Sequence, residues 1–308
     1  MPLDSALAKI VDAYRTCEFA TLARDGTPIT WPTAPLRRDD DTFLVTTSIA
    51  FAQKALNVRR DSRVALLFSE PTGSGWDGAE QVFISGTAIC PEEIVTSPSG
   101  DEAYWSMLFD RQPDSRHYVD LPTRWLMDWY YLRLLITITP TAVTVRPPLS
   151  VQSADRHSAV DVRLPLPGAD ILARFPTAVL GARDACGAPL LMRTPVQTTP
   201  EGFLVETAAD CEVVAGPASL LVHRHDDRLA GLYNALVRGE LRRSGDDDGW
   251  LLVPHRVVEP SAGGARTLRN ARRATSAYLR KRNLRQPRVD WPALKALAAA
   301  SGARAGAS

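Results

Sequence analysis

The feature that most constrains the fold is an internal repeat, because short segments of the first half recur in the same order in the second half. The matched pairs are Ala23-Arg24-Asp25 with Ala182-Arg183-Asp184, Gly26 and Pro28 with Gly187 and Pro189, Phe43-Leu44-Val45 with Phe203-Leu204-Val205, residues 65–68 with 219–222, and Gly86 with Gly239. Their offsets stay within roughly 153 to 161 residues, as a duplicated unit requires. We therefore expect two copies of one structural unit in tandem.

Extended segments dominate the first copy. Strands are expected over residues 19–23, 28–36, 43–47, 63–69, 81–89 and 130–145, and helices over 4–15 and 51–60. Asp25-Gly26 between two extended runs is a strong hairpin signal. Six strands with one helix inserted midway do not alternate as parallel units do, and they favour a small antiparallel barrel. The expected fold class is mostly β with flanking helices, with two tandem barrels.

The repeat divides the chain into four expected parts. Residues 1–150 would form the first barrel, 151–168 a linker rich in Asp, Ser and Pro, 169–260 the second barrel, and 261–308 a basic helical segment. The second copy is shorter where helix 51–60 stands in the first, so we expect that helix to be lost or reduced there. The Ala-rich end of the chain is expected to fray.

Charge and hydropathy restrict the partners and the location. The formal net charge is +1, yet residues 266–288 contain nine basic residues and no acidic one, so the rest of the chain is acidic. The arginines of residues 266–288 could bind nucleic acid or an anionic cofactor tail. A basic helix docked on this acidic body is the plainer interpretation, so a nucleic-acid partner is not expected. No apolar run is long enough to cross a membrane, and the N-terminus lacks a secretion signal. We expect a cytoplasmic protein with no membrane partner.

Residues 46–63 carry the strongest indication of a binding site. Thr47 and Ser48 end a predicted strand, and Lys54 lies in the first turns of the helix that follows. Hydroxyls and backbone N–H groups at such a helix start donate to phosphate oxygens, and a lysine adds a full positive charge. The alternative is a Ser/Thr cap followed by a solvated lysine.

With these motifs the chain resembles the flavin-binding split-barrel proteins, which include pyridoxamine 5'-phosphate oxidase and the flavin and deazaflavin oxidoreductases. The resemblance covers residues 15–145 well and 175–260 weakly. It rests on the Asp-Gly turn within 20–36, the spacing from Ser48 to Lys54, the apolar run after Arg63, and Gln81-Val82 before Gly86. It implies that each copy is a split β-barrel and that the two form an internal pseudo-dimer, a monomer open to further dimerisation.

The resemblance also implies a cofactor and its contacts. The implied cofactor-binding residues are Trp31, Thr33, Thr47, Ser48, Lys54 and Gln81. The two hydroxyls of 47–48 and the lysine would contact the phosphate of FMN, Gln81 would reach the cofactor from a neighbouring strand, and strand 30–35 would lie along the ring. Gln53 and Trp31 stand where oxidase-type members carry arginine, which leaves the deazaflavin coenzyme F-420 as an alternative, with haem as a weaker one.

These features favour a flavin- or deazaflavin-dependent oxidoreductase that transfers a hydride to or from a small organic substrate, since the cofactor itself supplies the redox chemistry. No catalytic side chain stands out. The second copy has no lysine between Thr207 and Arg224, so we expect one working site, built by the first barrel and walled by the second. The alternative is a non-catalytic split-barrel protein that binds a cofactor, haem or a metabolite.

The remaining clusters do not indicate a metal site. The four cysteines are scattered without a CxxC pair. His223 and His225 would share one face of a strand but lack a third ligand. Asp110, Asp114 and His117 are expected in a solvated loop, and the aromatic residues within 125–131 are expected to pack in the core.

Overall fold

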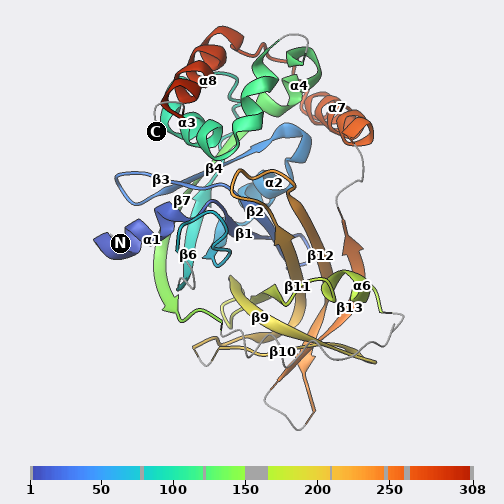
Figure 1. Cartoon of the computed structure of the whole chain (residues 1–308). Coiled ribbons are helices and arrows are strands. Elements are labelled where there is room, and N and C mark those ends of the chain that lie inside the picture. Colours follow the sequence, from blue (N-terminus) through green and yellow to red (C-terminus); the bar gives the residue numbers. More distant parts are fainter. Residues whose placement is uncertain are drawn as a thin grey trace.

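The computed structural model describes residues 3–76, 80–120, 123–149, 166–208, 210–245, 249–259 and 264–305. In these residues the chain forms two β-barrels of one design, with a layer of helices over the outer end of the first barrel (Figure 1). The predicted class, mostly β with flanking helices and two tandem barrels, is confirmed. Residues 151–165 of the predicted linker lie outside the described residues, and the proposed domain boundaries stay predictions.

The first barrel is an open seven-stranded sheet, and its two edges are the two parts of one broken strand. Its strands are β1 (Cys17–Leu22), β2 (Pro28–Thr33), β3 (Leu36–Arg37), β4 (Phe43–Ser48), β5 (Arg63–Phe68), β6 (Gln81–Ile89) and β7 (Arg133–Arg146), in the order β2-β1-β5-β6-β7-β4-β3. The segment expected as one strand is interrupted at Ala34-Pro35, since proline has no N–H to donate to a ladder. β2 therefore pairs only with β1, and β3 pairs only with the start of β4. β2 and residues 45–48 of β4 do not pair with each other, and the place where these two edges face is called the split below.

The second barrel repeats this order. Its strands are β8 (Thr177–Arg183), β9 (Pro189–Thr199), β10 (Gly202–Val205), β11 (Val214–Arg224), β12 (Tyr233–Arg243) and β13 (Trp250–Val258). The closed order β10-β13-β12-β11-β8-β9 is that of the first barrel, with the unbroken β9 in place of β2 and β3. The duplication inferred from the sequence is confirmed.

Hydrogen bonds correct one detail of the sequence match. The first hairpin turn is closed by Gly26 N–H donating to the carbonyl of Ala23, and its counterpart by Gly187 N–H donating to the carbonyl of Asp184. Ala23 thus corresponds to Asp184, so the match between the two Ala-Arg-Asp tripeptides is wrong by two residues, while the glycine match is confirmed. The turn needs glycine because its φ is +78° at Gly26 and +74° at Gly187.

Helices lie mainly around the first barrel. They are α1 (Ser5–Ala13), the 3-10 turn η1 (Ile49–Phe51), α2 (Gln53–Arg60), α3 (Glu102–Arg111), the 3-10 helix η2 (Pro113–Val119), α4 (Arg124–Tyr131), α6 (Ala169–Leu172), α7 (Gly264–Lys281) and α8 (Trp291–Ala305). Asp4 caps α1, as expected, by accepting from Leu7 N–H at 2.8 Å. None of the described helices is both long enough and apolar enough to cross a membrane.

The helices differ from the sequence expectations in two places and agree with them in a third. Asp110, Asp114 and His117 are exposed, as expected, but they lie in helical turns rather than in a loop. The last strand begins at Arg133, after α4. The Ala-rich segment that was expected to fray is helical as far as Ala305, and Leu294 and Ala298 of this helix, α8, are buried in one cluster with Trp105 of α3; residues 306–308 lie outside the described residues. Between β10 and β11 the described residues contain no helix. The predicted loss of a counterpart of α2 from the second copy is therefore confirmed.

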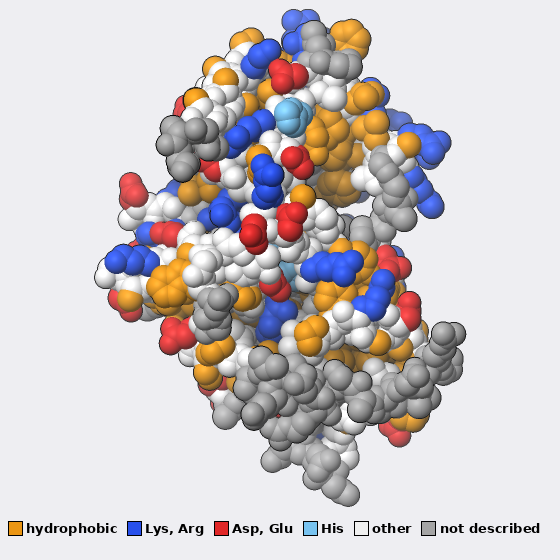
Figure 2. Space-filling view, in the orientation of Figure 1, with side chains coloured by type: hydrophobic (Ala, Val, Ile, Leu, Met, Phe, Trp, Pro, Cys, Tyr) orange, Lys and Arg blue, Asp and Glu red, His pale blue; other side chains and the backbone are white. Residues whose placement is uncertain are grey.

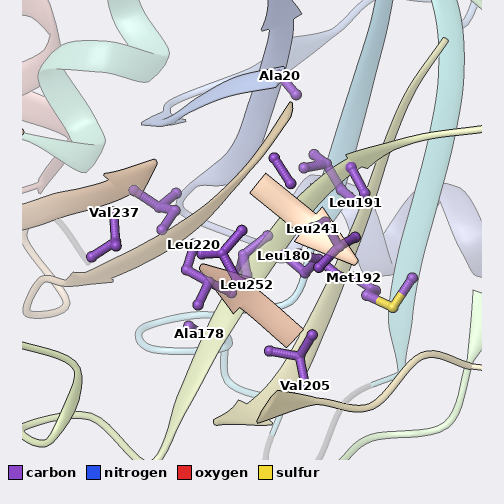
Figure 3. Close-up of a cluster of buried hydrophobic side chains, with 14 of the residues drawn as sticks. Ala20, Ala178, Leu180, Leu191, Met192, Val205, Leu220, Val237, Leu241 and Leu252 are labelled. Atoms are coloured by element: carbon purple, nitrogen blue, oxygen red, sulfur yellow. The ribbon is translucent and has the colours of Figure 1, made fainter. Parts of the chain in front are cut away.

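The two barrels share an apolar contact. Figure 3 shows the cluster in the second barrel, which includes Leu180 and Leu220. Ala20 and Leu67, on β1 and β5 of the first barrel, belong to the same cluster. The surface between the barrels, called the seam below, is therefore closed by packed side chains.

Candidate functional site

Three of the predicted cofactor residues meet at the split. Trp31 and Thr33 share one face of β2, because alternate residues of a strand point the same way. Lys54, in the first turn of α2, donates from Nζ to Thr33 Oγ1 at 3.2 Å. The same Nζ lies 5.5 Å from the centroid of the Trp31 ring, within the range of a cation–π contact. These three residues are called the Lys54 group.

Lys54 carries a charge that the surrounding protein does not neutralise. Among the residues that the structure describes, no carboxylate lies within ion-pair distance of its Nζ. Burial lowers the pKa of Lys54 to about 8; Cys17 acts in the opposite direction, and the charge of Arg133 lowers the pKa further. A desolvated cation without a counter-ion costs folding free energy, and a bound anion would offset that cost.

Thr47 and Ser48 lie at the end of β4, but their hydroxyl protons are used by the protein itself. Thr47 Oγ1 donates to the carbonyl of Phe51 at 2.9 Å, and Ser48 Oγ donates to the carbonyl of Trp129. Ser48 Oγ also accepts from Ala50 N–H at 3.1 Å and so caps η1. The capping interpretation therefore describes Ser48, whereas Lys54 is only partly exposed and its ammonium contacts Thr33 and Trp31.

Gln81 is not brought to the Lys54 group. Strands β1 and β5 lie between β6 and β2, so the distance along the sheet from β6 to β2 is roughly 14 Å at the usual strand spacing. Its neighbour Val82 belongs to the core of the first barrel, so Gln81 points to the outer face of the sheet. Gln81 Nε2 donates to the carbonyl of Pro147 at 3.3 Å, and its Oε1 is buried without a partner.

Arg133 is a second cation of this region, and it was missed in the sequence. It begins β7 directly opposite Ser48 and is only 8% exposed. Its guanidinium lies 4.1 Å from the centroid of the Tyr130 ring, and NH1 donates to Thr46 Oγ1 at 3.4 Å. Nε and NH2 are buried without a hydrogen-bond partner. A buried guanidinium with unmet donors is unusual and indicates a place for an acceptor.

The aromatic residues expected in the core are divided. Trp129 and Tyr131 are buried, but Trp125 is 68% exposed. Phe51, which is 53% exposed, lies edge-on to Trp129 with the ring centroids 5.8 Å apart. Trp129 Nε1 is buried without a partner. An aromatic surface thus lies beside Thr47 and Ser48, where a planar ligand could stack.

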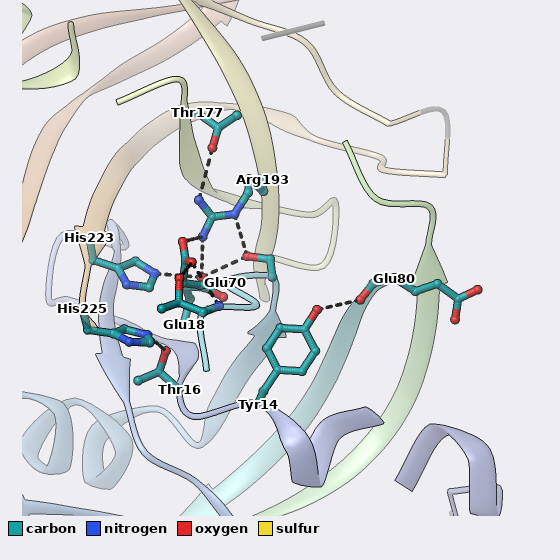
Figure 4. A network of polar contacts seen from close by, with 11 residues as sticks. Tyr14, Thr16, Glu18, Glu70, Glu80, Thr177, Arg193, His223 and His225 are labelled. Atoms are coloured by element: carbon teal, nitrogen blue, oxygen red, sulfur yellow. Dashed lines mark hydrogen bonds and ion pairs between the residues drawn. The ribbon is translucent and has the colours of Figure 1, made fainter. Parts of the chain in front are cut away.

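A separate polar cluster fills part of the seam (Figure 4). Glu18 of β1 is fully buried, and its Oε1 accepts from His223 Nε2 at 2.8 Å, from Arg193 at 2.8 Å and from Ser69 Oγ at 2.9 Å. Burial opposes ionisation of Glu18, but the hydrogen bond from His223 and the charge of Arg193 outweigh it, and the pKa of Glu18 lies below its ordinary value.

His225 belongs to the same seam. Its Nδ1 donates to the carbonyl of Asp226 at 2.9 Å, so a neutral ring would accept at Nε2 from Thr16 Oγ1, which is 3.0 Å away. The two histidines therefore join the barrels. No group of three metal-ligating side chains occurs in the described ranges.

Two cavities lie away from the split. One of about 350 Å³ is lined by residues of the segment 91–101 and by Leu135. The other, about 240 Å³, is lined by Val119, Arg124, Trp291, Pro292 and Lys295. Neither is lined by a predicted cofactor residue, so neither cavity supports the predicted site.

Comparisons with known proteins give matches only among solved structures. No protein-family model matches the chain, and no curated protein matches it. A conserved hypothetical protein of Mycobacterium tuberculosis is 22% identical with a TM-score of 0.34, over 48% of this chain and 86% of that protein. A Listeria innocua protein described as a candidate pyridoxamine 5'-phosphate oxidase is 20% identical, with a TM-score of 0.32 over 46% and 95%. An F420 reductase is 22% identical, with a TM-score of 0.33 over 47% and 98%.

These three matches each span just under half of this chain.

Proposed function

We propose that the split of the first barrel binds the phosphate of FMN, or of the deazaflavin coenzyme F-420, and that the protein is an oxidoreductase acting on a small organic substrate. The observation that carries the proposal is the Lys54 ammonium, desolvated and without a carboxylate partner among the described residues, held against Thr33 and Trp31. The unmet donors of buried Arg133 support it, because they add positive potential to the same region.

The residues at the split fit an anionic group. Lys54 would pair with the phosphate, Thr33 would fix the position of the ammonium, and Trp31 would offer an aromatic face beside it. A bound flavin or deazaflavin supplies hydride transfer, so the protein needs to hold it, orient it and exclude water. Gln81 lies on the other face of the sheet and is left out of the proposed contacts.

The test is replacement of Lys54 by methionine, which keeps the length and removes the charge. The variant is expected to weaken cofactor binding by about 1.5–3 kcal/mol, the range for a charge-assisted contact. FMN, F-420 and haem would be titrated separately and followed by absorbance and fluorescence. Lys9→Met, an exposed lysine on α1, is the matched control and is expected to bind as the parent does. Equal affinity of the Lys54→Met variant and the parent would remove Lys54 from the site.

The pH profile supplies a second readout of the same contact. Lys54 attracts an anion only when protonated, so affinity in the parent is expected to fall as the pH rises through about 8 or somewhat above, because the bound anion itself raises the pKa. Lys54→Arg keeps its charge and is expected to hold its affinity through this range. A flat profile in the parent would contradict the assignment.

Stability gives an independent prediction for Lys54. The unfolded chain keeps a pKa near 10.5 and the folded protein about 8, so between these values the unfolded state binds more protons and stability rises with pH. Without ligand, Lys54→Met is therefore expected to melt higher than the parent at pH 7, by about 2 °C or more. Differential scanning calorimetry from pH 7 to 10 should show the difference narrowing. If Lys54→Met melted at a lower temperature than the parent at pH 7, Lys54 would be shown to stabilise the fold.

One observation favours the alternative, a non-catalytic binding protein. The protons of Thr47 and Ser48 are already donated to backbone carbonyls, which leaves fewer donors for a phosphate than the sequence implied. The two functions are separated by adding a reductant such as NADPH to the cofactor-loaded protein. Enzymatic bleaching of the cofactor absorbance supports the oxidoreductase, and a spectrum that stays unchanged with every candidate reductant supports a carrier.

A further inference from the structure

Helix α7 has an apolar side and an arginine side. Ala271, Thr275, Tyr278 and Leu279 are buried, and the helix packs on η1 and α4. On the opposite side lie four exposed arginines, here called the arginine stripe: Arg266, Arg269, Arg273 and Arg280. At 100° and 1.5 Å per residue they fall within about 60° of one another around the helix axis and span about 21 Å. Figure 2 shows basic side chains gathered at the right edge of the molecule, where α7 lies in Figure 1.

The stripe has no counter-charge of its own. Residues 264–289 include no acidic residue, and in the described part of the chain no carboxylate is within ion-pair distance of the four arginines. Arg269 and Arg273 are four residues apart on one face, so they repel each other. The basic helix docks on the body of the protein, as expected, and its apolar side makes the contact.

The sequence alone did not lead us to expect a nucleic-acid partner, but the arrangement of the exposed arginines does: we propose that the arginine stripe binds the sugar–phosphate backbone of duplex DNA. A row of guanidiniums on a rigid helix matches a row of phosphates, because arginine pairs with phosphate through two parallel hydrogen bonds. A lipid surface fits less well, since an interfacial helix inserts its apolar side and that of α7 is buried in the protein. The stripe also has no aromatic side chain on which unpaired bases could stack, which favours a duplex over a single strand.

The test is the salt dependence of binding to a short fluorescein-labelled DNA duplex, measured by fluorescence anisotropy. With four phosphate contacts the slope of log K against log salt is expected to be about −3.6. In Arg269→Gln/Arg273→Gln/Arg280→Gln the slope should fall to about −1 and the affinity by at least about ten-fold at low salt. The control is Arg24→Gln/Arg228→Gln/Arg256→Gln, which removes the same charge from exposed positions elsewhere and is expected to keep the steep slope.

Three outcomes overturn the proposal. These are absence of DNA binding by the parent, equal losses in the two triple variants, and binding to phosphatidylserine vesicles with none to DNA. The stripe variant keeps the Lys54 group intact, so its cofactor titration should match that of the parent. Failure of the stripe proposal is therefore distinguishable from failure of the proposed function.

Discussion

Arg193→Met is expected to lower the free energy of unfolding by about 3–5 kcal/mol, because it leaves the buried Glu18 carboxylate without its cationic partner. Arg193 joins the barrels through Glu18 at 2.8 Å and Ser69 Oγ at 2.9 Å, and within its own barrel it donates to Thr177 Oγ1 at 3.2 Å. Glu18 is fully buried and cannot recover the lost interaction from water. The loss should appear as cooperative unfolding at lower urea concentration.

The control for Arg193 is another arginine–carboxylate pair of the same type. Arg242 contacts Glu201 at 3.0 Å, with side chains 55% and 72% exposed, so Arg242→Met should cost less than about 1 kcal/mol. A loss from Arg193→Met as small as that of the control would contradict the account of the seam.

Acid titration of the same variants shows in which direction their stability changes with pH. The folded pKa of Glu18 is below its unfolded value, so its stabilising effect is complete above the unfolded pKa and is lost as the pH falls through the folded pKa. In Arg193→Met the folded pKa should rise, and stability should begin to fall at a higher pH.

Gly239→Ala is expected to destabilise the second barrel by about 3 kcal/mol through a backbone clash. A Cβ at this position would lie 2.3 Å from the carbonyl oxygen of Val253 on the neighbouring strand. The ladder between β12 and β13 shifts register at Gly239, so the close approach belongs to a β-bulge. Backbone cannot move aside as a flexible side chain can, and the strands would have to separate.

The repeat supplies a parallel test. Gly86 stands at the corresponding bulge between β6 and β7, where a Cβ would lie 2.6 Å from the carbonyl oxygen of Thr139, so Gly86→Ala should behave alike. Gly302→Ala in α8 is the control, because its Cβ would meet only Arg116 at 3.8 Å and alanine favours a helix. Urea unfolding of the three variants checks the prediction, and a stable Gly239→Ala protein would show that the bulge relaxes freely.

The barrels could be predicted from the sequence because their signals are local and occur twice. The Asp-Gly turn, the alternating strands and the recurring Phe-Leu-Val segment each report short-range structure, and several matches in the same order support one another even though the Ala-Arg-Asp match was misplaced. The helices of residues 102–131 were not predicted, because their polar residues were interpreted as a loop and their aromatic residues as a core cluster. These helices are stabilised by packing against α8, which lies far along the chain.

The site could be predicted only in part, for a similar reason. Lys54, Thr33 and Trp31 are brought together by one strand and one helix start, which spacing can suggest. Arg133 opens an apolar strand far from Lys54 in the sequence, and only the pairing of β4 with β7 places it beside Ser48. The outward direction of Gln81 follows from the register of β6, which the sequence pattern left open.

Covalent continuity between the barrels has a consequence for how the molecule responds to dilution. Where two separate polypeptides share such a surface, lowering their concentration pulls them apart, whereas here the two halves remain at a fixed, high effective concentration. Glu18 on one half and Arg193 on the other are therefore neighbours at any dilution. Under the proposed function, such a molecule would bind one ligand per polypeptide, because residues 207–224 of the second half contain no lysine.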